Sequence, residues 1–398
     1  MTSLEGISSL HLEKNVKFLR TCGFYRLDQN SPKKYIILHT IYMRFLLLFF
    51  LLYTVQQVLK VNEVRNDVDQ MMDTMFLMLT NTDCIYKALV LWKKADQIEE
   101  VLNVMKGPVF NQGKPEHRVL LLETISKALL LFRVLNSTAL FTCFLWALHP
   151  TILHVQGKPI DFQVWFPFDP NSNPQYYMVV FYVWVQTSWL AYCNTATDIF
   201  IAFLLEQCRT QISILRLDLE SVVEKSKEET IKSSLSFAQI INRRFNKMLI
   251  HHREIVNTAD KIQDIFGGAV FYQFLVSGWI LCTSTYRMIN LDPATLEFVS
   301  MIMYVMCILV ELYLFCYYGD KVTSESEKLT DSAYAMDWLE LPASEMKSLI
   351  IFMERAKRPI RPMAGLTIPL CNSTFVSFVK NYTYFKNSFI LTISVFVP

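Results

Sequence analysis

Residues 45–53 read FLLLFFLLY, and this run lies within a longer apolar stretch, residues 35–58. A helix needs roughly 20 mostly apolar residues to cross the hydrocarbon core of a bilayer. Apolar side chains make up 52% of the 398 residues, charged side chains make up 19%, and mean hydropathy is +0.27. Soluble domains carry about 25% charged residues. The composition therefore excludes an ordinary soluble or disordered protein and predicts a membrane protein.

Six further stretches have the length and composition of membrane-spanning helices. The second of the seven is interrupted by Asn81, Asp83 and Lys87, and it has the weakest pattern together with the last. The sequence therefore predicts an all-α, seven-transmembrane fold in a single domain, residues 1–398. The expected spans are residues 35–58, 68–91, 128–148, 175–205, 265–289, 295–317 and 374–397.

Lysine and arginine are distributed unequally between the two sides of these spans. One side carries 29 of these residues and the other carries four. Because cytoplasmic loops are enriched in lysine and arginine, the N-terminus is expected in the cytoplasm. Seven crossings then place the C-terminus outside the cell, and residues 149–174 form an extracellular loop.

Two cytoplasmic segments are expected to be helical extensions of the membrane bundle, residues 206–264 and 318–373. Residues 175–266 contain neither glycine nor proline, so a helix can leave the membrane without a break. Both segments have apolar residues at helical spacing, and such faces must be buried. We interpret them as anchor helices for subunit assembly; the alternative is that they pack only on each other.

The C-terminal third carries many motif elements at fixed spacing. Residues 316–338 read CYYGDKVTSESEKLTDSAYAMDW, and residues 354–385 read ERAKRPIRPMAGLTIPLCNSTFVSFVKNYTYF. These stretches, and more weakly residues 250–282, resemble the insect odorant receptors. The chain length and the C-terminal sequence are similar to a ligand-tuned subunit rather than to the shared co-receptor, Orco.

This resemblance implies a function in olfaction. It implies a heterotetramer with Orco around one central pore, in the plasma membrane of sensory neurons. A small volatile organic molecule would bind in the outer half of the helix bundle. Its binding would open a nonselective cation channel without a G protein.

A pocket for such a ligand needs aromatic and aliphatic walls with one or two polar groups. The outer halves of four spans supply candidates, and Ser137, Tyr177 or Tyr304 is expected to make the polar contact. The candidate ligand-binding residues are Met72, Met75, Phe76, Leu79, Ser137, Leu140, Phe141, Phe144, Tyr177, Val180, Phe181, Trp184, Phe298, Met301, Tyr304 and Val305.

The resemblance also implies that the last span lines the pore. Asn387, Ile390 and Leu391 lie at i, i+3 and i+4 and therefore share one helix face. An apolar ring with one polar position can gate by dewetting. We expect Lys386, beside that face, to point away from the cation pathway.

Ionisable residues inside spans are functional candidates by default. Asp83 and Arg133 are expected to form one interior pair. His251 and His252 are adjacent and do not face one another on a helix, so we expect ordinary helix residues rather than a metal site. The nine cysteines are scattered, without a CxxC pair. No cofactor or metal is expected.

Other classes of protein fit the sequence less well. A G-protein-coupled receptor has the opposite orientation, and its motifs after the third span and in the seventh are absent. A gustatory-type receptor or a homomeric chemosensory channel shares the topology and stays open as an alternative. The sequence has no catalytic set of residues, which argues against an enzyme. The net charge of +2 gives little support for a nucleic-acid partner.

Overall fold

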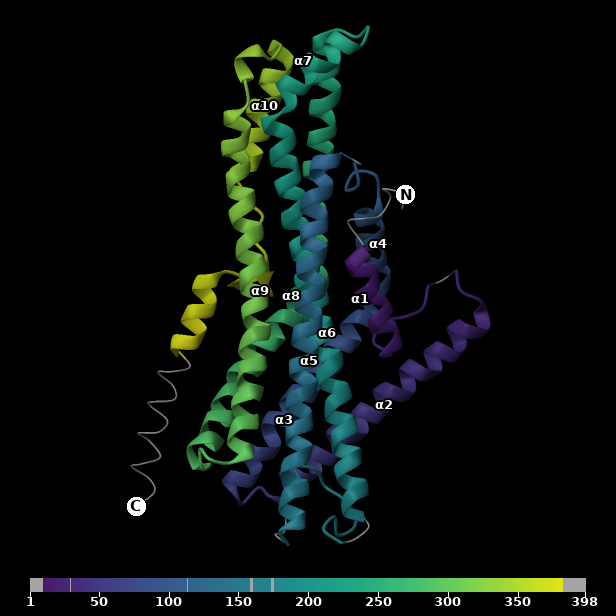
Figure 1. Cartoon of the computed structure of the whole chain (residues 1–398), viewed down its shortest axis with the longest axis vertical. Coiled ribbons are helices and arrows are strands. Elements are labelled where there is room, and N and C mark those ends of the chain that lie inside the picture. Colours follow the sequence, from purple (N-terminus) through teal and green to yellow (C-terminus); the bar gives the residue numbers. More distant parts are fainter. Residues whose placement is uncertain (1–9, 29, 113, 158–159, 173–174, 382–398) are drawn as a thin grey trace.

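The computed structural model describes residues 10–28, 30–112, 114–157, 160–172 and 175–381. Most of these residues are helical, and the longest helices run side by side along the long axis of the molecule (Figure 1). The helices are α1 (Leu10–Thr21), α2 (Lys33–Glu63), α3 (Val68–Lys93), α4 (Ala95–Lys106), α5 (Pro115–Val155), α6 (Gln175–Glu220), α7 (Val222–Lys232), α8 (Phe237–Asn290), α9 (Leu296–Ala335), the 3-10 turn η2 (Trp338–Glu340) and α10 (Ala343–Ala356).

Five of the described helices are long and apolar enough to cross a membrane: α2, α5, α6, α8 and α9. The α3 helix covers the second expected span, but Asp83 and Lys87 lie within it. Residues 372–381 are helical and begin the last expected span. The candidate pore residues Asn387, Ile390 and Leu391, and also Lys386, lie outside the described residues. The predicted all-α, seven-transmembrane fold is confirmed.

The α6 helix is the centre of the bundle, and α2 lies at its edge. In the most apolar window of α6, 78% of the residues are buried, whereas in α2 only 11% are buried. The α6 helix packs on α5, α8 and α9. The outward face of α2 presents large apolar side chains, as expected of a helix that contacts lipid.

The α6, α8 and α9 helices continue past the expected spans without a break. Together with α7 and α10 they form the far end of the molecule, at the top of Figure 1. Apolar residues of these extensions are buried in the same core as the spans, among them Leu215, Ile241, Phe245 and Phe352. The anchor segments 206–264 and 318–373 are therefore largely helical here, although their position relative to a membrane stays a prediction.

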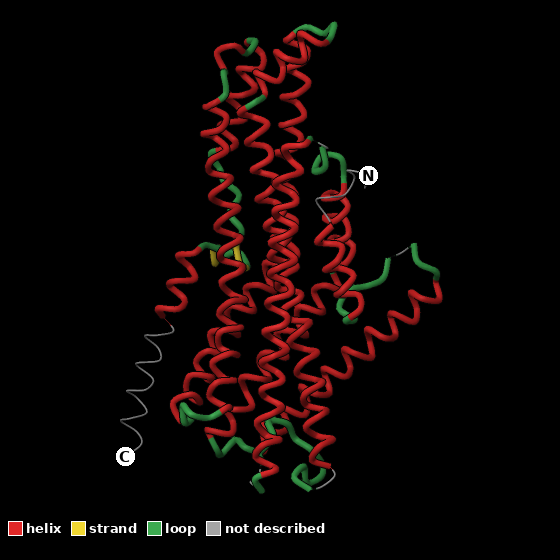
Figure 2. The backbone as a smooth tube through the Cα atoms, viewed as in Figure 1, coloured by secondary structure: helices red, strands yellow, loops and turns green. Residues whose placement is uncertain are grey.

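A short antiparallel hairpin connects α10 to the helical residues 372–381. It pairs β1 (Met363–Ala364) with β2 (Ile368–Pro369), the two strands marked in Figure 2. The Gln263 side chain of α8 fastens this hairpin: its Nε2 donates to the carbonyls of Met363 (2.6 Å) and Gly365 (2.7 Å), and its Oε1 accepts from the Met363 amide (2.7 Å). Gly365 has a φ of 62°, a conformation that glycine adopts without strain.

His251 is buried in the extension of α8, outside the expected span. Its Nε2 lies 2.9 Å from Gln211 Oε1, and its Nδ1 lies 3.4 Å from Gln112 Nε2. One neutral tautomer donates to the first amide and accepts from the second. Burial lowers the pKa of His251 to about 4, although the Asp218 carboxylate acts in the opposite direction. The ring is therefore neutral at pH 7.

We expect acid to weaken this part of the bundle. The histidine pKa is about 6.5 in an unfolded chain, so the unfolded state binds more protons than the folded state between pH 6.5 and 4. Stability is complete above pH 6.5 and is lost as the pH falls toward 4. The melting temperature of the purified receptor measured across this range should fall more steeply than that of His251→Gln. Equal slopes would contradict the prediction.

Candidate functional site

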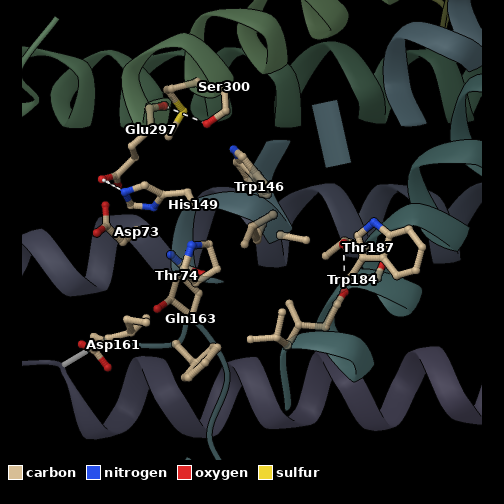
Figure 3. Close-up of a pocket in the computed structure, with 18 of the residues that line it drawn as sticks. Asp73, Thr74, Trp146, His149, Asp161, Gln163, Trp184, Thr187, Glu297 and Ser300 are labelled. Carbon is tan, nitrogen blue, oxygen red and sulfur yellow. Dashed lines mark hydrogen bonds and ion pairs between the residues drawn. The ribbon is translucent and has the colours of Figure 1, made fainter. Parts of the chain in front are cut away.

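A cavity of about 310 Å³ lies near the end of the bundle opposite α7 and α10. It is bounded by α3, α5, α6 and α9, with contributions from α2, α8 and the loop after α5 (Figure 3). Ligand pockets measure about 300–1,000 Å³, so this cavity suits one small molecule. Its lining residues are Lys60, Gln70, Asp73, Thr74, Phe76, Leu77, Cys143, Trp146, Ala147, His149, Pro150, Leu153, Ile160, Asp161, Phe162, Gln163, Val180, Val183, Trp184, Thr187, Arg287, Glu297, Ser300 and Met301.

Three aromatic rings from three helices pack together at the cavity. The ring centroids of Phe76 and Trp146 are 5.5 Å apart, those of Phe76 and Tyr304 are 5.4 Å apart, and those of Trp146 and Tyr304 are 5.5 Å apart. Such distances are typical of favourable edge-to-face and offset contacts. The Tyr304 hydroxyl lies 2.6 Å from Thr80 Oγ1, which fixes the ring behind the cavity wall. A rigid aromatic wall favours a small apolar ligand.

The ionisable groups around the cavity are paired with one another. Arg287 of α8 lies between Asp73 of α3, at 2.5 Å, and Glu297 of α9, with which it also forms an ion pair. His149 Nε2 faces the same Glu297 carboxylate at 3.6 Å (Figure 3). Lys60 Nζ lies 2.9 Å from Asp161 in the loop after α5. These pairs connect residues of five helices (α2, α3, α5, α8 and α9) and one loop around the cavity.

The structure places four of the sixteen candidate ligand-binding residues in the cavity wall. These are Phe76, Val180, Trp184 and Met301. Leu79, Tyr304 and Val305 pack against the apolar cluster that contains Phe76 and Met301. Met72, Met75 and Phe298 are half-buried elsewhere on these helices. Six others are exposed on the outer surface of the bundle: Ser137, Leu140, Phe141, Phe144, Tyr177 and Phe181.

The candidate list contains neither the polar residues that line the cavity nor Trp146. On α5 the candidates Leu140, Phe141 and Phe144 form one helix face, which is exposed, whereas Cys143 and Trp146 lie on another face and line the cavity. A period of three to four residues distinguishes these faces but does not say which one is buried. The small and polar residues of the span could have indicated the buried face, because the face in contact with lipid favours large apolar side chains.

A buried polar cluster lies deeper in the bundle. Lys87 Nζ of α3 contacts Asp83 Oδ2 at 2.8 Å, Asp198 Oδ1 at 2.6 Å and Asn194 Oδ1 at 2.9 Å. The expected pair of Asp83 with Arg133 was wrong. Arg133 is exposed and donates to a carbonyl of its own helix, while Lys87, four residues from Asp83, is its partner.

Two further helices contribute to this cluster. Glu311 of α9 accepts hydrogen bonds from Asn194 Nδ2 (3.2 Å) and Thr195 Oγ1 (3.2 Å). Gln273 of α8 donates to Asp198 Oδ2 at 2.9 Å. The cluster therefore joins α3, α6, α8 and α9, the helices that surround the centre of the bundle.

Comparisons with known proteins agree with this architecture. The profile of the 7tm Odorant receptor family matches residues 67–383. Odorant receptor Or1 of Anopheles gambiae is 21% identical over 361 residues, which are 85% of each chain. Odorant receptor 85c of Drosophila melanogaster is 23% identical over 311 residues, 74% of this chain and 76% of that receptor.

Solved structures share the fold. The olfactory receptor OR5 of Machilis hrabei in complex with eugenol superposes with a TM-score of 0.82 at 14% identity, covering 96% of this chain and 99% of that one. A second structure of the same receptor superposes with a TM-score of 0.81. The fold defines a multi-pass, helical membrane protein. The chain belongs to the insect odorant receptor family, which is a family of receptors rather than enzymes.

Proposed function

We propose that this chain is the odorant-binding subunit of a heteromeric, ligand-gated, nonselective cation channel formed with the co-receptor Orco. The observation that carries the proposal is the aromatic cavity between α3, α5, α6 and α9 in a chain of the odorant receptor family. One solved relative of this fold is described as a complex with eugenol, a small volatile molecule.

The odorant enters from the outside in this proposal. The cavity wall includes residues 160–163 of the loop after α5, on the side with few lysines and arginines. That side is extracellular by the positive-inside rule. The N-terminus is then cytoplasmic, and the cavity lies in the outer half of the bundle.

Assembly with other subunits is supported by exposed apolar side chains outside the expected spans. Tyr334, Leu339, Ile350 and Ile351 belong to α9, η2 and α10, and each is more than 60% exposed in the single chain. Large apolar side chains that are exposed in the single chain can be buried where subunits meet. We assign residues 206–264 and 318–373 to an anchor in which subunits meet.

The pore is assigned to the last span, residues 374–397, with Asn387, Ile390 and Leu391 facing the ions. The odorant site is assigned to the cavity wall. This wall contains four of the sixteen candidate residues, Phe76, Val180, Trp184 and Met301, and it also contains Trp146. Ligand binding and ion permeation then depend on different parts of the chain, and variants can separate them.

Whole-cell current tests the proposal directly. Cells expressing this chain with Orco should show a cation current during exposure to a volatile panel, with G-protein signalling blocked, and cells expressing either subunit alone should not show that response. Trp146→Ala should raise the half-maximal odorant concentration at least tenfold without changing ion selectivity, and Asn387→Ala should change selectivity alone. Current without Orco would indicate a homomeric channel, and a response abolished by the G-protein block would overturn the channel mechanism.

A further inference from the structure

Three hydroxyl groups line the cavity on three different helices. They belong to Thr74 of α3, Thr187 of α6 and Ser300 of α9. Thr74 and Ser300 are almost fully buried. A ligand that cannot form a hydrogen bond with a buried polar group binds less tightly, because that group loses its hydration without gaining a partner.

Each of these hydroxyls donates its hydrogen to the backbone of its own helix. Thr74 Oγ1 donates to the Gln70 carbonyl at 3.1 Å and Thr187 Oγ1 donates to the Val183 carbonyl at 2.8 Å. Ser300 Oγ donates to the Glu297 carbonyl at 2.8 Å (Figure 3). A hydroxyl has one hydrogen and two lone pairs. A ligand that contacts any of these hydroxyl groups therefore meets a hydrogen-bond acceptor.

We infer that the cavity selects neutral ligands that carry a hydroxyl group, namely alcohols and phenols, over ethers of the same shape. The inference rests on the proposed function of the cavity as the odorant site. A ligand hydroxyl donates to one of the three oxygens and can accept from the Trp146 indole N–H, which belongs to the same wall. An ether oxygen can accept from Trp146 in the same way, but it has no hydrogen to donate to the three oxygens and therefore makes one hydrogen bond fewer.

Charged ligands are disfavoured by the same wall. The carboxylates of Asp73 and Glu297 are both paired with Arg287, and Asp161 is paired with Lys60. A carboxylate ligand would face hydroxyl lone pairs while losing its own hydration, and an ammonium ligand would lose hydration without gaining a carboxylate that is free of a cation.

The remaining wall accommodates the apolar body of the ligand. Phe76, Leu77, Val180 and Met301 supply aromatic and aliphatic surface. Met301 is almost fully buried, and methionine adapts to ligands of different shape. The apolar wall therefore discriminates only weakly between ligands of different shape. The hydroxyl group of the ligand supplies the larger part of the selectivity.

Two matched pairs of compounds test this inference on the purified, assembled receptor. Octanol and heptyl methyl ether have the same atoms, and eugenol and methyl eugenol differ only by a methyl group on the phenol oxygen. Ligand affinity is read from the rise in melting temperature with ligand concentration, which does not require the channel to open. We expect the hydroxyl member of each pair to bind about tenfold more tightly, because the ether leaves one hydrogen bond unmade.

Variants that keep the shape of the wall assign the selectivity to these oxygens. Thr74→Val, Thr187→Val and Ser300→Ala should each reduce the alcohol-to-ether affinity ratio, and the triple variant should bring it close to one. Thr142→Val is the matched control, because Thr142 is buried on α5, donates to Thr138 at 2.9 Å and does not line the cavity. The ratio is independent of the amount of protein.

The outcomes separate this inference from the proposed function. Equal affinities within each pair would overturn the inference while leaving the cavity as a ligand site. A preference for the hydroxyl member that survives in the triple variant would overturn the assignment to the three oxygens. Failure of all four compounds to stabilise the receptor would overturn both the inference and the proposed role of the cavity.

Discussion

Replacing Lys87 with methionine should leave little folded receptor at the cell surface. The Lys87 ammonium is almost fully buried and contacts three oxygens, of Asp83, Asp198 and Asn194. Methionine fills a similar volume but carries no charge, so two carboxylates stay buried without their cation. Removing one partner of a buried ion pair destabilises a protein by about 3–5 kcal/mol. Surface labelling and the melting temperature of the detergent-purified protein measure the loss.

One control substitution, at an exposed lysine, and one compensating substitution, at Asp198, test whether the loss of stability comes from the buried charge. Lys127→Met removes a cation whose ion pair with Glu123 is exposed, and such pairs contribute about 0–1 kcal/mol. Lys127→Met should therefore express normally. Adding Asp198→Asn to Lys87→Met removes one uncompensated charge and should restore part of the lost stability. Normal melting of the single Lys87→Met variant would show that the buried cluster contributes little.

The buried cluster also shows how far the sequence alone could lead. Asp83 was recognisable as a charged residue inside a span, and burial of such a group requires a partner. Lys87 stands at i+4 from Asp83, so the local rule favoured the pair that the structure contains. The contacts of Lys87 with Asp198 and Asn194 could not be predicted in this way, because they depend on the packing of α3 against α6.

The cavity shows a different limit. The length and hydropathy of the apolar segments were sufficient to predict the all-α fold, because a bilayer sets the length of a spanning helix. The residues that line the cavity were harder to predict, since large apolar residues are favoured both against lipid and in the wall of a pocket. On α5, Phe141 and Phe144 are about half exposed, while Trp146 lines the cavity. Which face points inward is decided by contacts with the other helices.

The two C-terminal motif stretches meet in a close contact between Gly319 and Leu370. Gly319 closes the sequence CYYG on α9 and lies directly against Leu370, which follows the β1–β2 hairpin. A Cβ atom at Gly319 would lie 2.5 Å from both the Cβ and the carbonyl oxygen of Leu370. The next residues of the chain begin the helix 372–381, where Asn372 Nδ2 donates to Asp320 Oδ2 at 2.8 Å. The position of that helix therefore depends on this contact.

Gly319→Val should displace the hairpin and the helix that follows it. Overpacking in a well-packed region costs about 1–3 kcal/mol, and we expect the upper end because a backbone carbonyl cannot rotate away from the new methyl groups. The matched control is Gly278→Ala on α8, where the new Cβ would meet Phe378 at 3.7 Å, an ordinary contact. Replacing a glycine inside a helix with alanine gains roughly 0.5–1 kcal/mol, so this control should melt at the same temperature or higher.

Two readouts distinguish a local displacement from general unfolding in the Gly319→Val variant. The melting temperature and the surface amount report stability, and the odorant-evoked current per surface receptor reports the path from the cavity to the last span. We expect both to fall, with the current falling further, because the hairpin leads directly into the segment assigned to the pore. Gln263→Leu, which removes the side chain that fastens the hairpin from α8, should lower the current in the same way. Unchanged current in both variants would show that the last span is positioned without the hairpin.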